Sequence, residues 1–216
     1  MRSLVSVILL CIGVMARADT LVVLGDSISA AYGLDKADGW VSLLEQQLIE
    51  HCDNISVKNA SVSGETTAGG LARLPAILEE TKPSLLVIEL GGNDGLRGLS
   101  PKVMQQNLKQ MIQLGKQAGA RVVVLGIYVP PNLGAAYSRL FEQAFVAAVE
   151  AEQVPFHPFF LDKVFDQPEL MQDDGLHPTA AAQPQLLENG LMVMAPEIAR
   201  ICPAFPVAAT TAENVQ

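Results

Sequence analysis

Short apolar stretches alternate with amphipathic stretches of a dozen or more residues along most of the chain. The first apolar stretch, 20–24, is rich in valine and leucine, as in a strand buried on both faces. The stretch 40–51 then carries Val41, Leu44 and Leu48 at helical spacing. This alternation repeats and predicts further strands at 55–60, 85–90, 122–127 and 154–156, and further helices at 70–80, 101–118, 136–152 and 183–201.

This pattern predicts an α/β fold. Parallel strands need crossover connections of about a dozen residues, and the helical stretches supply them. Strands joined in this way predict one three-layer α/β/α sandwich, with a five-stranded parallel sheet in the flavodoxin-like order 2-1-3-4-5. The domain is expected over residues 19–202. A mobile C-terminal tail is expected over 203–216, because that segment lacks an amphipathic pattern.

Residues 1–18 have the features of a secretory signal peptide. Arg2 supplies a positive charge, residues 4–15 form an apolar segment, and residues 16–18 form a small-x-small cleavage site. An apolar segment of about twelve residues is shorter than the roughly 20 needed to span a bilayer. The protein is therefore expected to be exported to the periplasm, with no transmembrane segment in the mature chain.

Export changes the charge and the cysteine count. Removing Arg2 and Arg17 from 14 basic and 23 acidic residues leaves a formal net charge of −11, which argues against nucleic acid as a partner. Cys11 is lost with the signal peptide, so Cys52 and Cys202 remain as a pair without metal-site spacing. Cys52 follows the first predicted helix and Cys202 the last, and these two helices are neighbours in a 2-1-3-4-5 sheet. This placement predicts a disulfide between the two cysteines; two free thiols are the alternative.

Polar residues and glycines follow the predicted strands, at the sheet edge where parallel sheets bind ligands. Ser27 follows the first strand, Gly64 the second and Asn93 the third, while Asp174 and His177 follow the fifth. Acyl transfer needs such a set: a nucleophile, a base, an acid that orients the base, and hydrogen-bond donors for an oxyanion.

Each of these residues also has a purely structural interpretation. Ser27 alone could cap a helix, and Gly64 or Asn93 could serve a turn or a left-handed loop. Asp174 and His177 could form a structural hydrogen-bonded pair. Taken together, these interpretations require a coincidence at four strand ends, so the joint pattern favours a catalytic site.

The same residues resemble the sequence blocks of the SGNH, or GDSL, hydrolases. Four blocks of that family are matched in order by Gly25-Asp26-Ser27, by Gly64, by Asn93, and by Asp174 with His177. Ile28 stands where the family usually has leucine, and the similarity covers most of residues 20–195. The serine block also differs from the Gly-x-Ser-x-Gly elbow of α/β-hydrolases.

The resemblance implies a role for each residue. Ser27 is expected to attack the acyl carbonyl while His177 takes its proton and Asp174 orients the imidazole. The oxyanion hole is expected to comprise the backbone N–H of Ser27, the backbone N–H of Gly64 and the side-chain amide of Asn93.

The implied activity is hydrolysis of small-molecule carboxylic esters and thioesters through an acyl-enzyme, without a cofactor or metal. Fatty-acyl or aryl esters, acyl-CoA and lysophospholipid are the implied substrates, and the loop 128–133 is similar to one that borders the acyl groove. Two alternatives remain: a carbohydrate O-acetylesterase of the same family, and a flavodoxin-like protein whose loop 25–29 binds a phosphate or flavin. The second alternative leaves Asp174 and His177 without a role.

Overall fold

The computed structural model describes residues 19–207 and confirms the predicted α/β fold. Its five parallel strands form one sheet in the order β2-β1-β3-β4-β5. The strands are β1 (Asp19–Gly25), β2 (Ile55–Asn59), β3 (Leu85–Glu89), β4 (Arg121–Leu125) and β5 (Phe156–His157). The signal peptide predicted over 1–18, and residues 208–216 of the predicted tail, lie outside the described residues.

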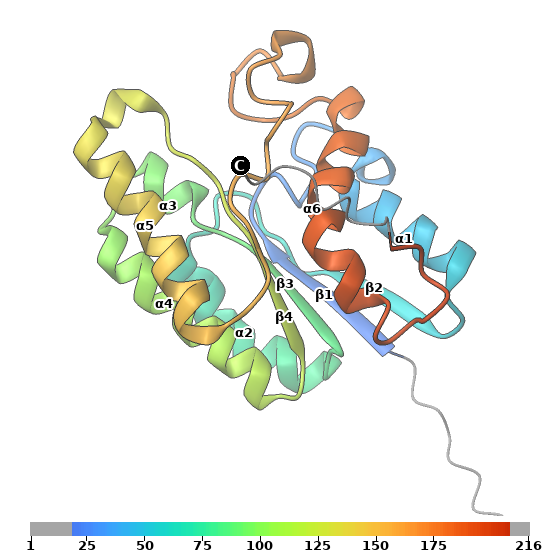
Figure 1. Cartoon of the computed structure of the whole chain (residues 1–216). Coiled ribbons are helices and arrows are strands. Elements are labelled where there is room, and N and C mark those ends of the chain that lie inside the picture. Colours follow the sequence, from blue (N-terminus) through green and yellow to red (C-terminus); the bar gives the residue numbers. More distant parts are fainter. Residues whose placement is uncertain (1–18, 208–216) are drawn as a thin grey trace, which may run out of the picture.

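Helices cover both faces of this sheet (Figure 1). One face carries α1 (Trp40–His51) and α6 (Gln183–Ile198), and the other carries α2 (Thr67–Thr81), α4 (Pro101–Gln117) and α5 (Ala135–Glu152). The short helix α3 (Gly92–Leu96) begins three residues after β3. Single 3-10 turns lie at Lys36–Asp38, Pro131–Leu133, Pro168–Leu170 and Ala180–Ala182.

The central strands are apolar because helices cover them on both sides. Side chains 21–24 of β1 and 85–88 of β3 are fully buried. On α1, the residues of the predicted spacing, Val41, Leu44 and Leu48, are buried, at 4%, 0% and 1% exposed. Burial of these side chains is the main stabilising contribution to the fold.

The fifth strand differs from the prediction. The sequence places it at 154–156, whereas the structure has it at Phe156–His157, at the edge of the sheet beside β4. Pro155 has no N–H to donate and contributes only its carbonyl, which accepts from the N–H of Val124. A long irregular segment separates β5 from α6, so Asp174 and His177 do not directly follow a strand.

The packed chain extends past residue 202, where the sequence places the end of the domain. Phe205 is only 3% exposed, and its ring lies edge-on to His51, with ring centroids 6.2 Å apart. Phe205 therefore packs against the end of α1, and this part of the predicted tail belongs to the folded domain.

A disulfide joins Cys52 and Cys202, whose Cα atoms are 5.7 Å apart, and confirms the predicted pairing. Cys52 caps the C-terminus of α1, and Cys202 follows α6, which lies beside α1 (Figure 1). The bond spans 150 residues of sequence and so links the two ends of the domain.

Replacing both Cys52 and Cys202 with serine should lower the free energy of unfolding by about 2–5 kcal/mol, because the bond restricts the unfolded chain over a long loop. Urea unfolding of the oxidised wild type and the double variant measures the difference. The reduced wild type serves as the control and should resemble the variant. Equal unfolding midpoints for all three samples would contradict this prediction.

Candidate active site

The predicted nucleophile, Ser27, lies in a turn directly after β1. Gly25, the last residue of β1, has no side chain, and a Cβ there would lie 2.6 Å from the Ser29 Cβ and 2.9 Å from Glu89 Oε2. Glycine thus allows the chain to fold back tightly over the sheet edge. The Oγ atom of the half-buried Ser27 faces a cavity at this edge.

Asp174 and His177 are presented by a separate turn between β5 and α6. An antiparallel bridge between Met171 and Pro178 closes this turn. The side-chain amide of Gln172 donates to the carbonyl oxygens of Tyr32 and Pro178, at 2.9 Å in each case. Gln172 therefore ties the Asp/His turn to the loop that carries Ser27.

The structure brings Ser27, His177 and Asp174 into one hydrogen-bonded chain. His177 Nε2 lies 2.9 Å from Ser27 Oγ, and His177 Nδ1 lies 2.6 Å from Asp174 Oδ2. The other carboxylate oxygen accepts the backbone N–H groups of Leu176 and His177, at 2.9 and 3.0 Å.

These hydrogen bonds, that from the His177 side chain above all, lower the pKa of Asp174 to about 2. Because an ionised carboxylate can only accept, Nδ1 of His177 carries a proton and Nε2 is free to accept from Ser27. The hydrogen-bonded series of Ser27, His177 and Asp174 is thus arranged for proton transfer from serine to imidazole.

Gly64 and Asn93 meet at the same cavity. Gly64 has a φ of +79°, a left-handed conformation that favours glycine, in the loop before α2. Asn93 is in α3, and its side-chain amide donates to Asp26 Oδ2 at 3.2 Å. Arg97, at the end of α3, donates to the Gly64 carbonyl oxygen at 2.8 Å and so links the two loops. All five residues predicted for the site therefore lie around one point.

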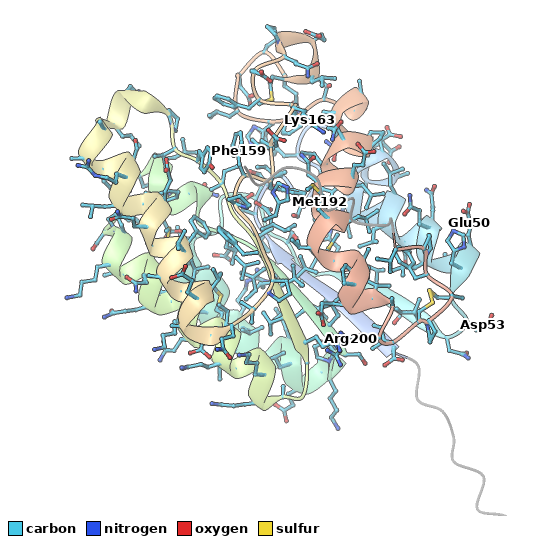
Figure 2. The ribbon with its side chains drawn as sticks, viewed as in Figure 1. Glu50, Asp53, Phe159, Lys163, Met192 and Arg200 are labelled. Atoms are coloured by element: carbon cyan, nitrogen blue, oxygen red, sulfur yellow. A yellow bond between two sulfur atoms is a disulfide. The ribbon has the colours of Figure 1, made fainter. Side chains whose placement is uncertain are left out.

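The cavity has a volume of about 580 Å³ and mainly apolar walls. Its wall comes from the segments after β4 and β5, where Tyr128 stacks on Phe159 with ring centroids 4.3 Å apart. Figure 2 shows Phe159 on the segment after β5, near the loops at the carboxyl end of the sheet. The apolar wall residues are Ile127, Tyr128, Val129, Pro130, Phe159, Leu161 and Phe165.

The sequence indicated only part of this wall. The loop 128–133 was expected there, and its first three residues line the cavity. Phe159, Leu161 and Phe165 were missed. Their signal was the run of aromatic residues after the weak fifth strand, which is equally compatible with core packing.

Three buried carboxylates beside the site were also missed. Asp26, Glu89 and Asp94 are 2%, 2% and 3% exposed. Asp94 accepts from both the backbone N–H and the hydroxyl of Thr67, at 2.8 and 2.5 Å, so α3 is bound to the start of α2. The sequence signals were the place of Asp26 in the Gly25-Asp26-Ser27 block and an acidic residue, Glu89, at the end of an otherwise apolar strand.

The other histidines lie away from the cavity lining. His51 ends α1, and His157 is buried in β5, where burial lowers its pKa. Within residues 19–207, no cluster of three or more potential metal ligands occurs, and no helix is long and apolar enough to cross a membrane.

Known proteins are similar to this chain in sequence and in fold. A family model for GDSL-like lipases and acylhydrolases matches residues 23–183. The chain belongs to this GDSL-like lipase/acylhydrolase family. The family resemblance and the hydrolase class predicted from the sequence blocks are therefore confirmed.

Individual relatives of this GDSL hydrolase carry esterase and thioesterase names. Esterase TesA of Pseudomonas aeruginosa is 54% identical over 174 residues, which cover 81% of this chain and 87% of that protein. Thioesterase 1/protease 1/lysophospholipase L1 of Escherichia coli K12 is 43% identical over 169 residues, covering 78% of this chain and 80% of that protein. A crystal structure of TesA matches the fold with a TM-score of 0.80 at 53% identity, over 83% of this chain and 99% of that one.

Proposed function

We propose that this GDSL hydrolase cleaves carboxylic esters and thioesters, with Ser27 as nucleophile, His177 as general base and Asp174 as the acid that orients it. The observation that carries this proposal is the hydrogen-bonded chain from Ser27 Oγ through the imidazole to the Asp174 carboxylate, beside an apolar cavity. No cofactor is needed for this chemistry.

The reaction follows from the geometry. Ser27 Oγ attacks the acyl carbonyl carbon as its proton moves to His177 Nε2, and the carbonyl oxygen becomes an oxyanion. The imidazolium, stabilised by the ionised Asp174, then gives the proton to the departing alkoxide or thiolate, which leaves as the alcohol or thiol. Water attacks the Ser27 acyl ester in the same manner and releases the carboxylic acid.

We assign the oxyanion hole to the backbone N–H groups of Ser27 and Gly64 and to the side-chain amide of Asn93. These groups border the cavity beside His177. They come from three separate segments, the turn after β1, the loop before α2 and the helix α3, so the fold sets their relative positions before substrate binds. Fixed donors of this kind stabilise developing charge without reorganisation.

Replacing Asn93 with alanine should lower kcat by about 10²- to 10³-fold with little change in KM, because the donor acts mainly on the transition state. Steady-state kinetics with a p-nitrophenyl ester measures both constants. Asn107→Ala is an amide-removing control away from the cavity lining and should retain kcat. A change confined to KM would show that Asn93 only binds substrate.

Fatty-acyl and aryl groups are the acyl class that the cavity supports best. Its volume of about 580 Å³ and its aromatic wall exceed what an acetyl group needs. Thioesters and lysophospholipid are supported by the name of the Escherichia coli relative, whereas acyl-CoA comes from the family resemblance of the sequence. The flavodoxin-like binding alternative gains no support from the relatives, and it still leaves the Ser27–His177–Asp174 chain without a role.

The test of this substrate class is a chain-length series of p-nitrophenyl esters, with matched thioesters and lysophospholipids. We expect kcat/KM to rise from acetyl to longer acyl groups, because each buried methylene contributes about 0.8 kcal/mol. Phe159→Ala should flatten this rise, since it removes part of the apolar wall. A steep preference for acetyl would favour the carbohydrate O-acetylesterase alternative instead.

We further propose that residues 1–18 are removed as a signal peptide and that the mature protein is periplasmic. The disulfide between Cys52 and Cys202 supports this, because such bonds persist in oxidising compartments. Mass spectrometry of the periplasmic fraction should give an N-terminus at Asp19; a soluble form that retains Met1 would refute cleavage.

A further inference from the structure

Two buried acidic side chains, Asp26 and Glu89, lie next to each other at the carboxyl end of the sheet. Asp26 belongs to the loop that carries Ser27, residues 25–29, which we call the nucleophile loop, and Glu89 ends β3. Each is 2% exposed, and in the sheet register Glu89 lies opposite Gly25, the residue before Asp26. Within the described part of the chain, neither forms an ion pair with lysine or arginine. Buried carboxylates are costly unless they are well hydrogen-bonded, so their contacts need a physical reason.

Asp26 uses its two oxygens to join two parts of the site. Oδ1 accepts the backbone N–H of Ile28 at 3.1 Å, within the nucleophile loop. Oδ2 accepts the side-chain amide of Asn93 at 3.2 Å. Asp26 is therefore the link between the loop that carries Ser27 and the Asn93 donor on α3.

Glu89 holds the other side of the same loop. Glu89 Oε2 accepts from the Ser29 hydroxyl at 2.7 Å and lies 3.4 Å from the backbone nitrogen of Asp26. The indole N–H of the buried Trp40 donates to Ser29 Oγ at 3.2 Å. The nucleophile loop is thus anchored to β3 and α1 as well as to α3.

We propose that Asp26 is a positioning residue of the oxyanion hole, whose carboxylate fixes the orientation of the Asn93 amide relative to Ser27. The inference rests on the proposed function. A carboxylate only accepts hydrogen bonds, so it selects the amide orientation that presents N–H to it. The second N–H of Asn93 then remains for the oxyanion. The side-chain carbonyl oxygen of Asn93 is turned away from the two negative charges, that of the Asp26 carboxylate and that of the oxyanion.

The electrostatics of the pair agree with this role. Burial raises the pKa of Asp26 to about 6, against the lowering effect of the Ile28 N–H, His177 and Asn93, while the charge of Asp94 adds to the rise. Burial and the charge of Asp26 raise the pKa of Glu89 well above its usual range. Asp26 is thus ionised near neutral pH. Below about pH 6 Asp26 becomes protonated and can itself donate, so it no longer selects one amide orientation.

The test is a double-mutant cycle of Asp26→Asn and Asn93→Ala, with kcat and KM measured near pH 7.5. An asparagine at position 26 keeps the shape but can donate as well as accept, so either orientation of Asn93 becomes possible. We expect kcat to fall by about 10²-fold with little change in KM, as for a misplaced catalytic donor. The same change in the Asn93→Ala background should cost less than about threefold, because the group that Asp26 positions is then absent.

Controls separate this inference from the proposed function. Asp38→Asn makes the same chemical change at an exposed site and should leave kcat unchanged. Ser27→Ala in the same assay should lose about 10⁶-fold in kcat; a kcat within tenfold of the wild type would refute the proposed function itself. If Ser27→Ala shows that loss and Asp26→Asn costs the same in both backgrounds, only the positioning role of Asp26 is overturned.

A second measurement does not depend on the Asp26 variant folding. Below about pH 6, kcat/KM of the wild type should fall more steeply than that of Asn93→Ala, because protonation of Asp26 lowers the rate only where Asn93 is present for it to position. Parallel acid limbs in the two proteins would overturn the proposal.

Discussion

Replacing Ser27 with alanine should lower kcat by about 10⁶-fold, the loss expected when the nucleophile of a serine, histidine and aspartate set is removed. The variant keeps His177, Asp174 and the oxyanion donors, but it has no oxygen to form the acyl-enzyme. A residual rate of about 10³- to 10⁴-fold over the uncatalysed reaction should remain from binding and the oxyanion hole.

The measurement is kcat for a p-nitrophenyl ester with enzyme at high concentration, so that the residual rate can be detected. Ser100→Ala is a matched control, because Ser100 is exposed at the start of α4 and its side chain makes no capping hydrogen bond. Ser27→Ala should unfold at the same temperature as the control. A kcat within tenfold of the wild type would exclude Ser27 as the nucleophile.

Replacing Asp174 with asparagine should lower kcat by about 10⁴-fold while leaving the fold intact. The asparagine oxygen can still accept the backbone N–H groups of Leu176 and His177 that hold the turn. The substitution removes the negative charge, however, and an asparagine side chain no longer requires a proton on Nδ1 of His177. The imidazole can then present N–H rather than a lone pair to Ser27.

Asp173→Asn is the matched control for this prediction. Asp173 is exposed and directly precedes Asp174, but the hydrogen bond to His177 comes from Asp174. The control should therefore retain kcat near the wild-type value. Similar losses in the two variants would indicate a general effect of charge on this turn instead of a specific role for Asp174.

The acid side of the wild-type pH profile also follows from this arrangement. Because hydrogen bonds hold the pKa of Asp174 at about 2, this group stays ionised above about pH 4. Loss of activity between pH 7 and pH 4 must therefore come from groups other than Asp174. Asp26 is one such group, because burial raises its pKa to about 6.

The architecture was predictable because its signals are local. A strand buried on both faces, such as residues 21–24 of β1, is continuously apolar, and α1 follows a helical period from Trp40 to His51. The prediction misplaced β5 because this strand has only two residues. Two residues are too few to show a strand or a helix pattern of apolar side chains. Phe205 was assigned to a mobile tail because an isolated aromatic residue does not indicate what it packs against.

The residues of the candidate site were predictable for a different reason. Ser27, Asn93, Asp174 and His177 are residue types with few structural uses in combination, and they resemble the sequence blocks of one family. The supporting residues have no such signal. The contact between Asp26 and Asn93 spans 67 residues, and the role of Glu89 depends on its register with Gly25. Such contacts arise from the packing of the sheet and not from any local pattern.

Covalent labelling of Ser27 tests the central claim most directly. A phosphonyl fluoride should react with the activated hydroxyl, forming a serine–phosphorus bond with loss of fluoride, while His177 takes the proton. Intact-mass measurement and peptide mapping should show one adduct per chain, located at Ser27, with activity lost in proportion to labelling. Ser27→Ala should show no adduct. An adduct on another residue, or full activity in protein labelled completely at Ser27, would contradict the account.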